Sequence, residues 1–153
     1  MMNDATVLSR LILTAFRANG ALVEAGDALV RDIGLTSARW QVLGALAEQA
    51  APRTVSQIAR TMGLTRQSVQ RVADDLRLAG LIDFLPNPDH ARSKLMSMTL
   101  AGQSAYAEAL RRQAPWVTGL AAGLSLEDVA AAIRVLSVIA DRLDANLQPP
   151  LEL

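Results

Sequence analysis

Forked hydrogen-bonding side chains recur at helical spacing in the segment LTRQSVQRVADDLRLAGLI, residues 64–82. At about 3.6 residues per turn, one face of such a helix carries an apolar stripe made of Val69, Val72, Ala73 and Leu76. The opposite face carries Gln67, Gln70, Arg71 and Asp74. A guanidinium or amide group can form two hydrogen bonds to one planar partner, as Arg does with guanine and Gln with adenine. The segment therefore predicts a helix that presents these groups to base edges.

A second short helix is predicted just before this one. Thr54 followed three residues later by Gln57 is typical of a capping box, and Gly63 ends that helix. Thr65 then caps the segment described above, and Gly80 ends it. Two short helices joined by a tight turn that contains glycine are typical of a helix-turn-helix. Such a unit places its second helix in the major groove of DNA.

The periodicity changes after Gly80. Two short strands are predicted from Ile82, Phe84, Leu95 and Met98. The loop between them, NPDHARSK, carries Arg92 near its tip, where a thin loop can bring a guanidinium into a narrow minor groove. An ion pair of Arg92 with Asp89 is the alternative use of this side chain.

Helices are predicted on both sides of this central part. The first runs from about Asp4 to Asp32, ends at Gly34, and has a narrow seam made of Leu8, Ile12, Ala15, Leu22, Gly26, Leu29 and Ile33. Thr36 caps a second helix, in which Trp40, Leu43 and Leu46 or Ala47 point one way.

Two more helices are predicted after the strands. One runs from about Ala101 to Gln113 and is bent or broken at Pro115, where it either ends or resumes to Ala122. The last is capped by Ser125 and has a seam made of Val129, Ile133, Leu136, Ala140, Leu143 and Leu147. Steps of four and three along both seams suit packing against another helix.

The composition limits the classes of function. With 51% apolar and only 3% aromatic residues among 153, the core must consist mainly of Leu, Ala, Val and Ile, which favours helices over sheets. The absence of cysteine excludes disulfides, thiolate metal sites and thiol redox sensing. No apolar run approaches the roughly 18–20 residues that span a bilayer, and no secretory signal begins the chain, so a cytoplasmic protein is expected.

The net charge is zero, but the charges are unevenly distributed. Between Arg53 and Lys94, seven basic residues stand against four acidic ones. Fourteen of the fifteen basic residues are Arg, which suits contacts with phosphates and bases, although a general bias in composition explains the excess equally well.

These patterns together give a set of candidate DNA contacts. The set comprises Thr65, Arg66, Gln67, Ser68, Gln70, Arg71, Arg92 and Lys94. Thr65 and Ser68, at the positive end of the helix dipole, are expected at phosphates. The alternative is that Arg66 and Arg71 are ordinary charged side chains that keep an exposed helix face hydrated.

Catalysis is not expected. His90, the single histidine, lacks companions for a metal site and lacks a nucleophile to activate, so it is interpreted as an exposed loop residue or a phosphate contact. No cofactor motif is present. A winged-helix module that binds protein instead of DNA is the alternative function, because such a module would need neither the Gln and Arg face nor the loop Arg.

The segments LTSARWQVLGALAEQ, TVSQIARTMGLTRQSVQRVADDLRLAGLI and NPDHARSKLMSMTLAG resemble the MarR family of winged helix-turn-helix transcriptional regulators. The match runs from about Leu35 to Gly102. The resemblance implies a mainly α fold: one domain over residues 1–153, with long dimerisation helices (4–34 and 101–148), a DNA-binding lobe (36–100) and a small two-stranded β wing. Arg92 aligns with the family's wing Arg, but His90 stands where the family usually has the Asp that orients it.

The resemblance also implies partners. It implies a homodimer that binds double-stranded DNA at a near-palindromic operator, and a repressor that a small aromatic or phenolic ligand releases. In such dimers the ligand lies between the dimerisation helices and the DNA-binding lobe. The candidate lining consists of Phe16, Arg17, Arg39, Trp40 and Trp116. The alternative for Phe16 and Trp40 is an ordinary place in the core.

Overall fold

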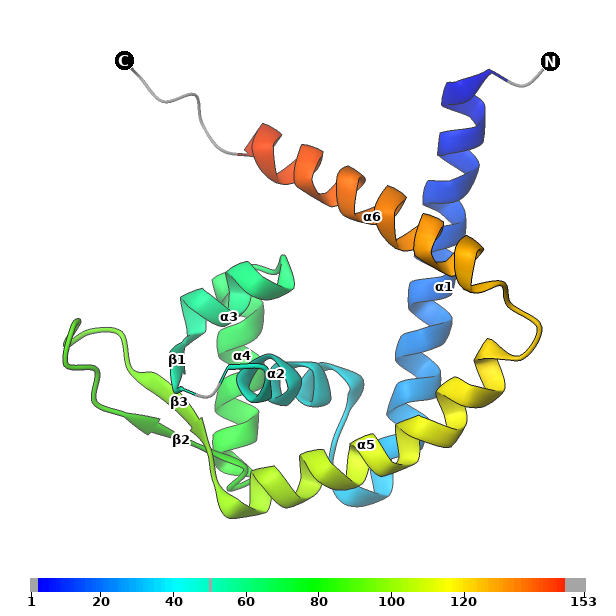
Figure 1. Cartoon of the computed structure of the whole chain (residues 1–153). Helices are drawn as coiled ribbons and strands as arrows, with labels where there is room; N and C mark the ends of the chain where they lie inside the picture. The colour runs from blue at the N-terminus through cyan, green and yellow to red at the C-terminus, as the bar shows by residue number, and fades with distance from the viewer. Residues whose placement is uncertain (1–2, 50, 148–153) are drawn as a thin grey trace, which may run out of the picture. The chain divides into compact units, whose positions relative to one another are not determined.

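The computed structural model describes residues 3–49 and 51–147 (Figure 1). The chain forms two compact units, one ending at Ala114 and the other beginning at Pro115. The first unit contains α1 (Asp4–Val30), η1 (Arg31–Ile33), α2 (Ser37–Ala47), β1 (Arg53–Thr54), α3 (Val55–Met62), α4 (Arg66–Leu78), β2 (Ile82–Leu85) and β3 (Leu95–Met98). Helix α5 (Leu100–Ala121) begins in the first unit and ends in the second, which also holds α6 (Leu126–Leu147). The predicted boundary at residue 148 lies outside the described residues.

The predicted helix caps are confirmed. The hydroxyl oxygens of Thr36 and Thr65 accept hydrogen bonds from the backbone N–H groups of Arg39 and Ser68, each at 3.2 Å. Thr54 and Gln57 form both bonds of the capping box. Gly63 ends α3 in the left-handed region, with φ of 63°, which a residue with a side chain rarely adopts. This turn sets the direction in which α4 leaves α3.

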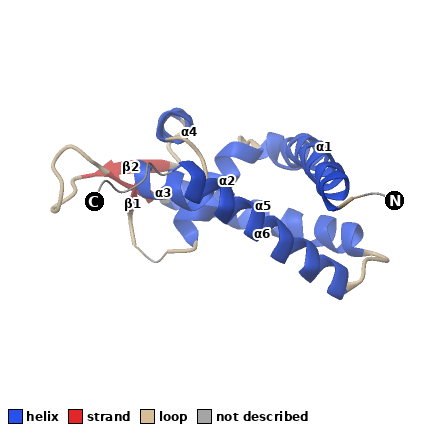
Figure 2. Cartoon of the chain, turned by 90° about the horizontal axis from the view of Figure 1, so that it is seen from above, coloured by secondary structure: helices blue, strands red, loops and turns tan. Residues whose placement is uncertain are grey.

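The sheet has three strands, so the prediction of a two-stranded wing was incomplete. The strand order is β1-β3-β2, and both pairings are antiparallel. Figure 1 labels the three strands, and Figure 2 draws the strands in red among the blue helices. Phe84 pairs with Met96 and Ile82 with Met98. Met96, which the periodicity did not single out, is the fully buried residue of β3. The two residues of β1 are too few to produce an alternating pattern in the sequence.

Helix α2 lies at the centre of the first unit, where it packs against α1, α3, α4 and β3. It buries Val42 and Ala45 as well as Leu43 and Leu46, while Trp40 is only half-buried. The predicted face with Leu43 and Leu46 is buried, but burial extends beyond it to Val42 and Ala45. A helix with neighbours on several sides buries residues all round, and periodicity alone does not reveal such a helix.

The two ends of α1 have different surroundings. Near its C-terminal end the Ser37 N–H donates to Asp27 Oδ1 (2.6 Å), and the Ser37 hydroxyl donates to the carbonyl oxygen of Val23 (2.8 Å). Val30 is fully buried there. Toward the N-terminus, Leu8 and Ile12 are exposed within the chain. The seam predicted for α1 is therefore part of the core at one end and uncovered at the other.

An ion-pair network around Arg112 joins α5 to the end of α1. Arg112 donates to the carbonyl oxygen of Leu29 (3.0 Å), to Asp32 Oδ2 (2.9 Å) and to Glu108 Oε1 (2.9 Å). The Arg112 bonds lower the pKa of Asp32 and, together with Arg111, that of Glu108. A carboxylate whose pKa is lowered by folding adds stability above its unfolded pKa and loses it as the pH falls through the folded value. These groups lie near solvent, so screening keeps the contribution modest.

The second unit consists of the end of α5 and α6. Helix α5 continues past Pro115 to Ala121, so it does not break at the proline. The Ser125 hydroxyl caps α6, as predicted, at 3.4 Å from the N–H of Asp128. Over residues 126–144 of α6, no residue is buried. Among the described residues, no helix combines the length and apolar character that a bilayer crossing requires.

The start of α5 is held close to the end of α4. The Thr99 hydroxyl donates to the carbonyl oxygen of Gly80 (2.7 Å) and accepts from the N–H of Gly102 (3.0 Å). At Gly102, the position of an added Cβ lies 1.9 Å from the carbonyl oxygen of Leu81. Because the obstructing atom belongs to the backbone, only glycine permits this approach.

We therefore expect Gly102→Ala to destabilise the protein by about 1–3 kcal/mol, the usual effect of overpacking a tight contact. The measurement is the midpoint of urea denaturation. Gly20→Ala is the matched control, since an added Cβ there meets no atom of the chain within 4 Å and alanine favours a helix. Equal midpoints for Gly102→Ala and the wild type would contradict the expected clash.

Candidate nucleic-acid interface

Helix α4 is anchored by its apolar stripe. Val69, Ala73 and Leu76 are buried, and the helix packs against α2, α3 and β2. Burying Val69 and Leu76 stabilises the fold by about 1.5–3 kcal/mol each. Since this stripe fixes the rotation of α4 about its own axis, the predicted polar face points away from the core. Gln67 and Arg71 are exposed, and Gln70 is half-buried.

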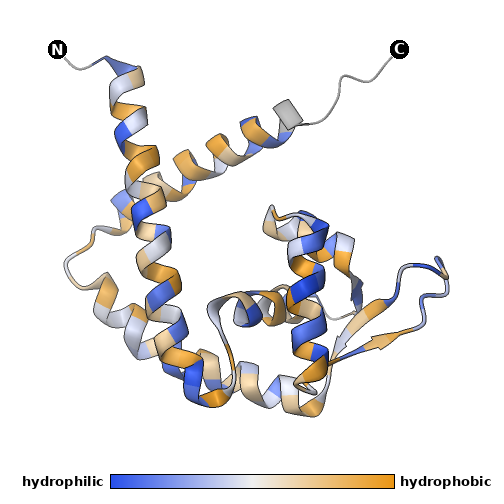
Figure 3. Ribbon diagram, turned by 180° about the vertical axis from the view of Figure 1, so that it is seen from behind, coloured by the Kyte–Doolittle hydropathy of each residue, from blue (hydrophilic) through white to orange (hydrophobic). Residues whose placement is uncertain are grey.

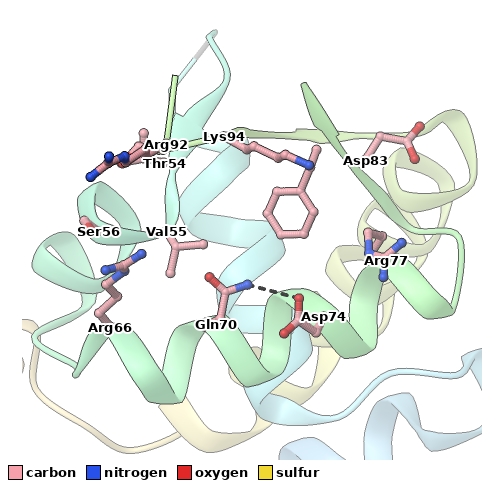
Figure 4. A pocket seen from close by; sticks show the side chains of 12 residues that line it. Thr54, Val55, Ser56, Arg66, Gln70, Asp74, Arg77, Asp83, Arg92 and Lys94 are labelled. Carbon is pink, nitrogen blue, oxygen red and sulfur yellow. Dashed lines mark hydrogen bonds between the residues drawn. The ribbon is translucent and has the colours of Figure 1, made fainter. Parts of the chain in front are cut away.

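A groove of about 680 Å³ lies between α4 and the wing. Its lining comes from the start of α3, from α4 and from the sheet with its loop: Thr54, Val55, Ser56, Arg66, Gln70, Asp74, Arg77, Asp83, Phe84, Arg92, Ser93 and Lys94 (Figure 4). A shallower hollow of about 520 Å³ on α4 is lined by Arg66, Gln67, Gln70, Arg71, Asp74 and Asp75. The structure thus gathers six of the eight predicted DNA contacts along these two hollows.

The groove is positively charged. Four basic side chains line it, against the carboxylates of Asp74 and Asp83. Among the residues that the structure describes, none of these four, Arg66, Arg77, Arg92 and Lys94, forms an ion pair, and neither does Arg71 of the other hollow. Cations without a partner in a concave surface concentrate the positive potential there, which suits a polyanion.

The β2–β3 loop is held by its own backbone and by Asn87. The Asn87 side chain donates to the carbonyl oxygen of Ser93 (2.8 Å) and accepts from the N–H of Asp89 (3.0 Å). Within the described part of the chain, Asp89 forms no ion pair with Arg92, which leaves the Arg92 guanidinium available. His90 is exposed, as predicted. Asn87, not a carboxylate, therefore stabilises this loop.

The two hydroxyl residues at the start of α4 are exposed but already bonded. The Thr65 oxygen accepts from the Ser68 N–H, and the Ser68 hydroxyl donates to the carbonyl oxygen of Thr65 at 2.9 Å. Among the described residues, no acceptor takes the Thr65 hydroxyl proton, so this proton is available to an anion. Ser68 must break a bond before it can donate.

The five candidate ligand residues have unrelated surroundings. Phe16 is 71% exposed, so the alternative that it is a core residue is wrong for the single chain. Arg17 is also exposed, and Trp40 packs against the core. Arg39 donates to the carbonyl oxygen of Gly34 (3.1 Å) and forms an ion pair with Asp75 at 3.9 Å. Trp116 belongs to the second unit. None of the five lines a groove described here.

Sequence reasoning missed some of the groove. Arg77 lies eleven residues after Arg66, three helical turns along the same face, and this spacing was a usable signal. Ser56 and Asp83 come from other elements, and no local pattern places them beside α4. Among the described residues, no cluster of His, Cys, Asp and Glu is arranged to hold a metal ion.

The central part of the chain matches a known protein family. Residues 33–93 match the model of the MarR family. A Mycobacterium tuberculosis protein without an assigned function is 42% identical over 96 residues, which make up 63% of this chain and 66%, just under two thirds, of that relative. The transcriptional activatory protein BadR of Rhodopseudomonas palustris is 27% identical over 100 residues, which make up 64% of this chain and 57% of BadR.

Solved structures resemble more of the chain. The regulator MosR of M. tuberculosis, in complex with DNA, superposes with a TM-score of 0.76 at 22% identity, over 90% of this chain and 98% of MosR, and so supports the fold alone. CouR of Rhodococcus jostii RHA1, bound to p-coumaroyl-CoA, superposes with a TM-score of 0.72 at 26% identity, over 81% of this chain and 87% of CouR.

Proposed function

Because the chain belongs to the MarR family of transcriptional regulators, we propose that it binds double-stranded DNA, with α4 in the major groove and the β2–β3 loop at the neighbouring minor groove. The observation that carries this proposal is the groove of net positive charge between α4 and the loop. A single helix fills a major groove about 12 Å wide, and its outward side chains reach base edges there.

The residues divide by role. Gln67, Gln70 and Arg71, on the outward face of α4, read bases. Arg66, Lys94 and the Thr65 hydroxyl contact phosphates, which sets register without conveying sequence. Arg92, on the loop, enters the minor groove, where the negative potential is strongest. The four basic groups form no ion pair with another described residue, which supports this division, since no such pair has to break before DNA binds.

The chain acts as a homodimer. Helix α6 exposes Val129, Ile133, Leu136, Ala140 and Leu143, which follow one another at steps of four and three. Helix α1 exposes Leu8, Ile12 and Phe16. Figure 3 shows hydrophobic bands, in orange, along both helices. Two apolar helix faces of this size seldom remain open to water on a monomer. A dimer sets two copies of α4 about one DNA turn, roughly 34 Å, apart, and a near-palindromic operator matches that spacing.

The bound dimer represses, and a small aromatic ligand releases it. CouR was solved with p-coumaroyl-CoA, whose acyl group is a phenol, which supports a ligand of this class. Phe16, Arg17, Arg39, Trp40 and Trp116 remain the proposed contacts. A ligand that favours a spacing of the α4 helices unlike that of the operator lowers DNA affinity, and DNA lowers ligand affinity by the same factor.

The dimer can be tested by mass. Each chain has a mass of 16.3 kDa, so light scattering after gel filtration should give about twice that value at micromolar concentration. Ile133→Glu, which puts a charge into the exposed seam of α6, should shift the mass toward that of one chain. Arg134→Gln, at the next position, is the control and should stay dimeric. A wild-type mass of one chain would contradict the dimer.

DNA binding can be tested by its salt dependence. Fluorescence anisotropy with duplex DNA should show log affinity falling linearly and steeply with log salt, because bound phosphates release counterions. Arg92→Ala should weaken binding and make that slope shallower by up to about one unit. A flat response of the wild type would instead favour a protein-binding module, and an unchanged Arg92→Ala variant would show that the loop makes no contact.

Base reading by Arg71 gives a separate prediction. If Arg71 bonds guanine at both acceptors, Arg71→Ala should cost about 1–3 kcal/mol on the selected operator and relax specificity at one base pair. Selection from a random duplex pool, repeated with the variant, measures this relaxation. A loss of equal size on every sequence would make Arg71 a phosphate contact.

A further inference from the structure

One hydrogen bond on the DNA-facing side of α4 joins Gln70 to Asp74. The Gln70 side-chain amide, through Nε2, donates to Asp74 Oδ1 at 3.0 Å, and both residues line both hollows (Figure 4). They are one turn apart, the spacing at which Gln and Asp side chains meet on a helix. An ionised carboxylate can only accept hydrogen bonds. The nitrogen end of the amide must therefore face Asp74, because the opposite orientation would set Oε1 against the carboxylate.

We propose that Asp74 is a positioning residue that holds the Gln70 amide in one orientation, so that this position of α4 selects adenine over guanine. The proposal rests on the proposed DNA binding through α4. Asp74 needs no contact with DNA, since it acts through Gln70.

The chemistry of the two purines gives the selectivity. In the major groove, adenine presents an N–H donor and an acceptor side by side, whereas guanine presents two acceptors. With one amide proton bound to Asp74, Gln70 offers an acceptor and one remaining donor. That pair matches adenine. At guanine the Gln70 oxygen would meet another acceptor, and the amide cannot turn over while Asp74 is ionised.

The surroundings of Asp74 indicate that its role is the hydrogen bond to Gln70 and not the neutralisation of a neighbouring cation. Asp74 lies in a groove with Arg66, Arg77, Arg92 and Lys94, yet within the described ranges, 3–49 and 51–147, it forms an ion pair with none of them. A carboxylate beside a phosphate backbone weakens DNA binding by charge repulsion. An acceptor that fixes the orientation of a base-reading amide compensates for that loss with specificity.

The test compares Asp74→Asn with Asp75→Asn. Each variant removes one negative charge from α4, but Asp75 pairs with Arg39 and not with Gln70. The amide that Asp74→Asn introduces has nearly the size of the carboxylate and can pair with either end of the Gln70 amide, so it no longer fixes the orientation. Competition anisotropy, with duplexes that differ only by adenine or guanine at each operator position, measures the preference.

Both variants should bind all duplexes more tightly because a repulsive charge is lost. In Asp74→Asn alone, the adenine-to-guanine preference at one operator position should fall by about 2- to 10-fold, the worth of one orienting hydrogen bond. Gln70→Ala should remove the preference at that same position. Adding Asp74→Asn to the Gln70→Ala variant should leave the adenine-to-guanine preference unchanged. Asp74→Glu, which keeps an acceptor-only group, should retain the adenine-to-guanine preference of the wild type.

The proposal is overturned if Asp74→Asn keeps the adenine-to-guanine preference of the wild type. It is also overturned if Asp75→Asn lowers that preference as much as Asp74→Asn does. If Gln70→Ala leaves every base preference intact while the wild type still binds with a steep salt dependence, the positioning role fails and DNA binding stands. If the wild type binds no duplex at all, the proposed function itself fails, and this result appears before any variant is made.

Discussion

The burial of one apolar stripe on α4 determines what the rest of this molecule can do. The stripe consists of Val69, Ala73 and Leu76, and α4 packs against α2, α3 and β2. Its burial fixes the rotation of α4 about the helix axis, and this rotation decides where every polar residue of α4 points. A rotation of one residue, about 100°, would expose Val69 and bury Gln70. The capped start at Thr65 and the left-handed turn at Gly63 fix the direction of the same helix. The outward polar groups of α4 are therefore placed by the packing of the helix and not by their own side chains.

Much of this arrangement was predictable because it depends on local chemistry. The caps at Thr36, Thr54, Thr65 and Ser125 follow from residue type and short spacing. Strand β1 was missed because its two residues form a strand only through pairing with β3. The network of Arg112 with Asp32 joins positions 80 residues apart, and no local pattern reveals such a contact. For α2 the prediction found only part of the buried surface, because burial on several sides removes the periodicity on which the prediction relied.

In the candidate site, too, the residues that follow from local sequence were predictable and those that depend on distant contacts were not. The face of α4 with Gln67, Gln70 and Arg71 follows from the helical period, and Arg92 follows from its place in a hairpin loop. The groove itself depends on how α3, α4 and the sheet meet, so the sequence did not indicate Ser56 or Asp83. The ligand site stays a prediction, and it rested on the family resemblance and on residue type. Arg39, taken as a ligand cation, bonds to Gly34 and to Asp75 on α4.

This contact of Arg39 with α4 bears on how the parts of the molecule depend on one another. Arg39 and the buried side of α2 hold α4 from one side, while Ser37, two residues earlier on α2, is bonded to the end of α1 through Asp27 and Val23. Arg112 then joins the end of α1 to α5. A displacement of α1 would therefore have to break the bonds of Ser37, or move α2 and with it α4. Packed elements of this kind shift as bodies between discrete arrangements and do not deform continuously. The ligand of the proposed regulator would therefore need no contact with the outward face of α4, since a change at α1 reaches α4 through α2.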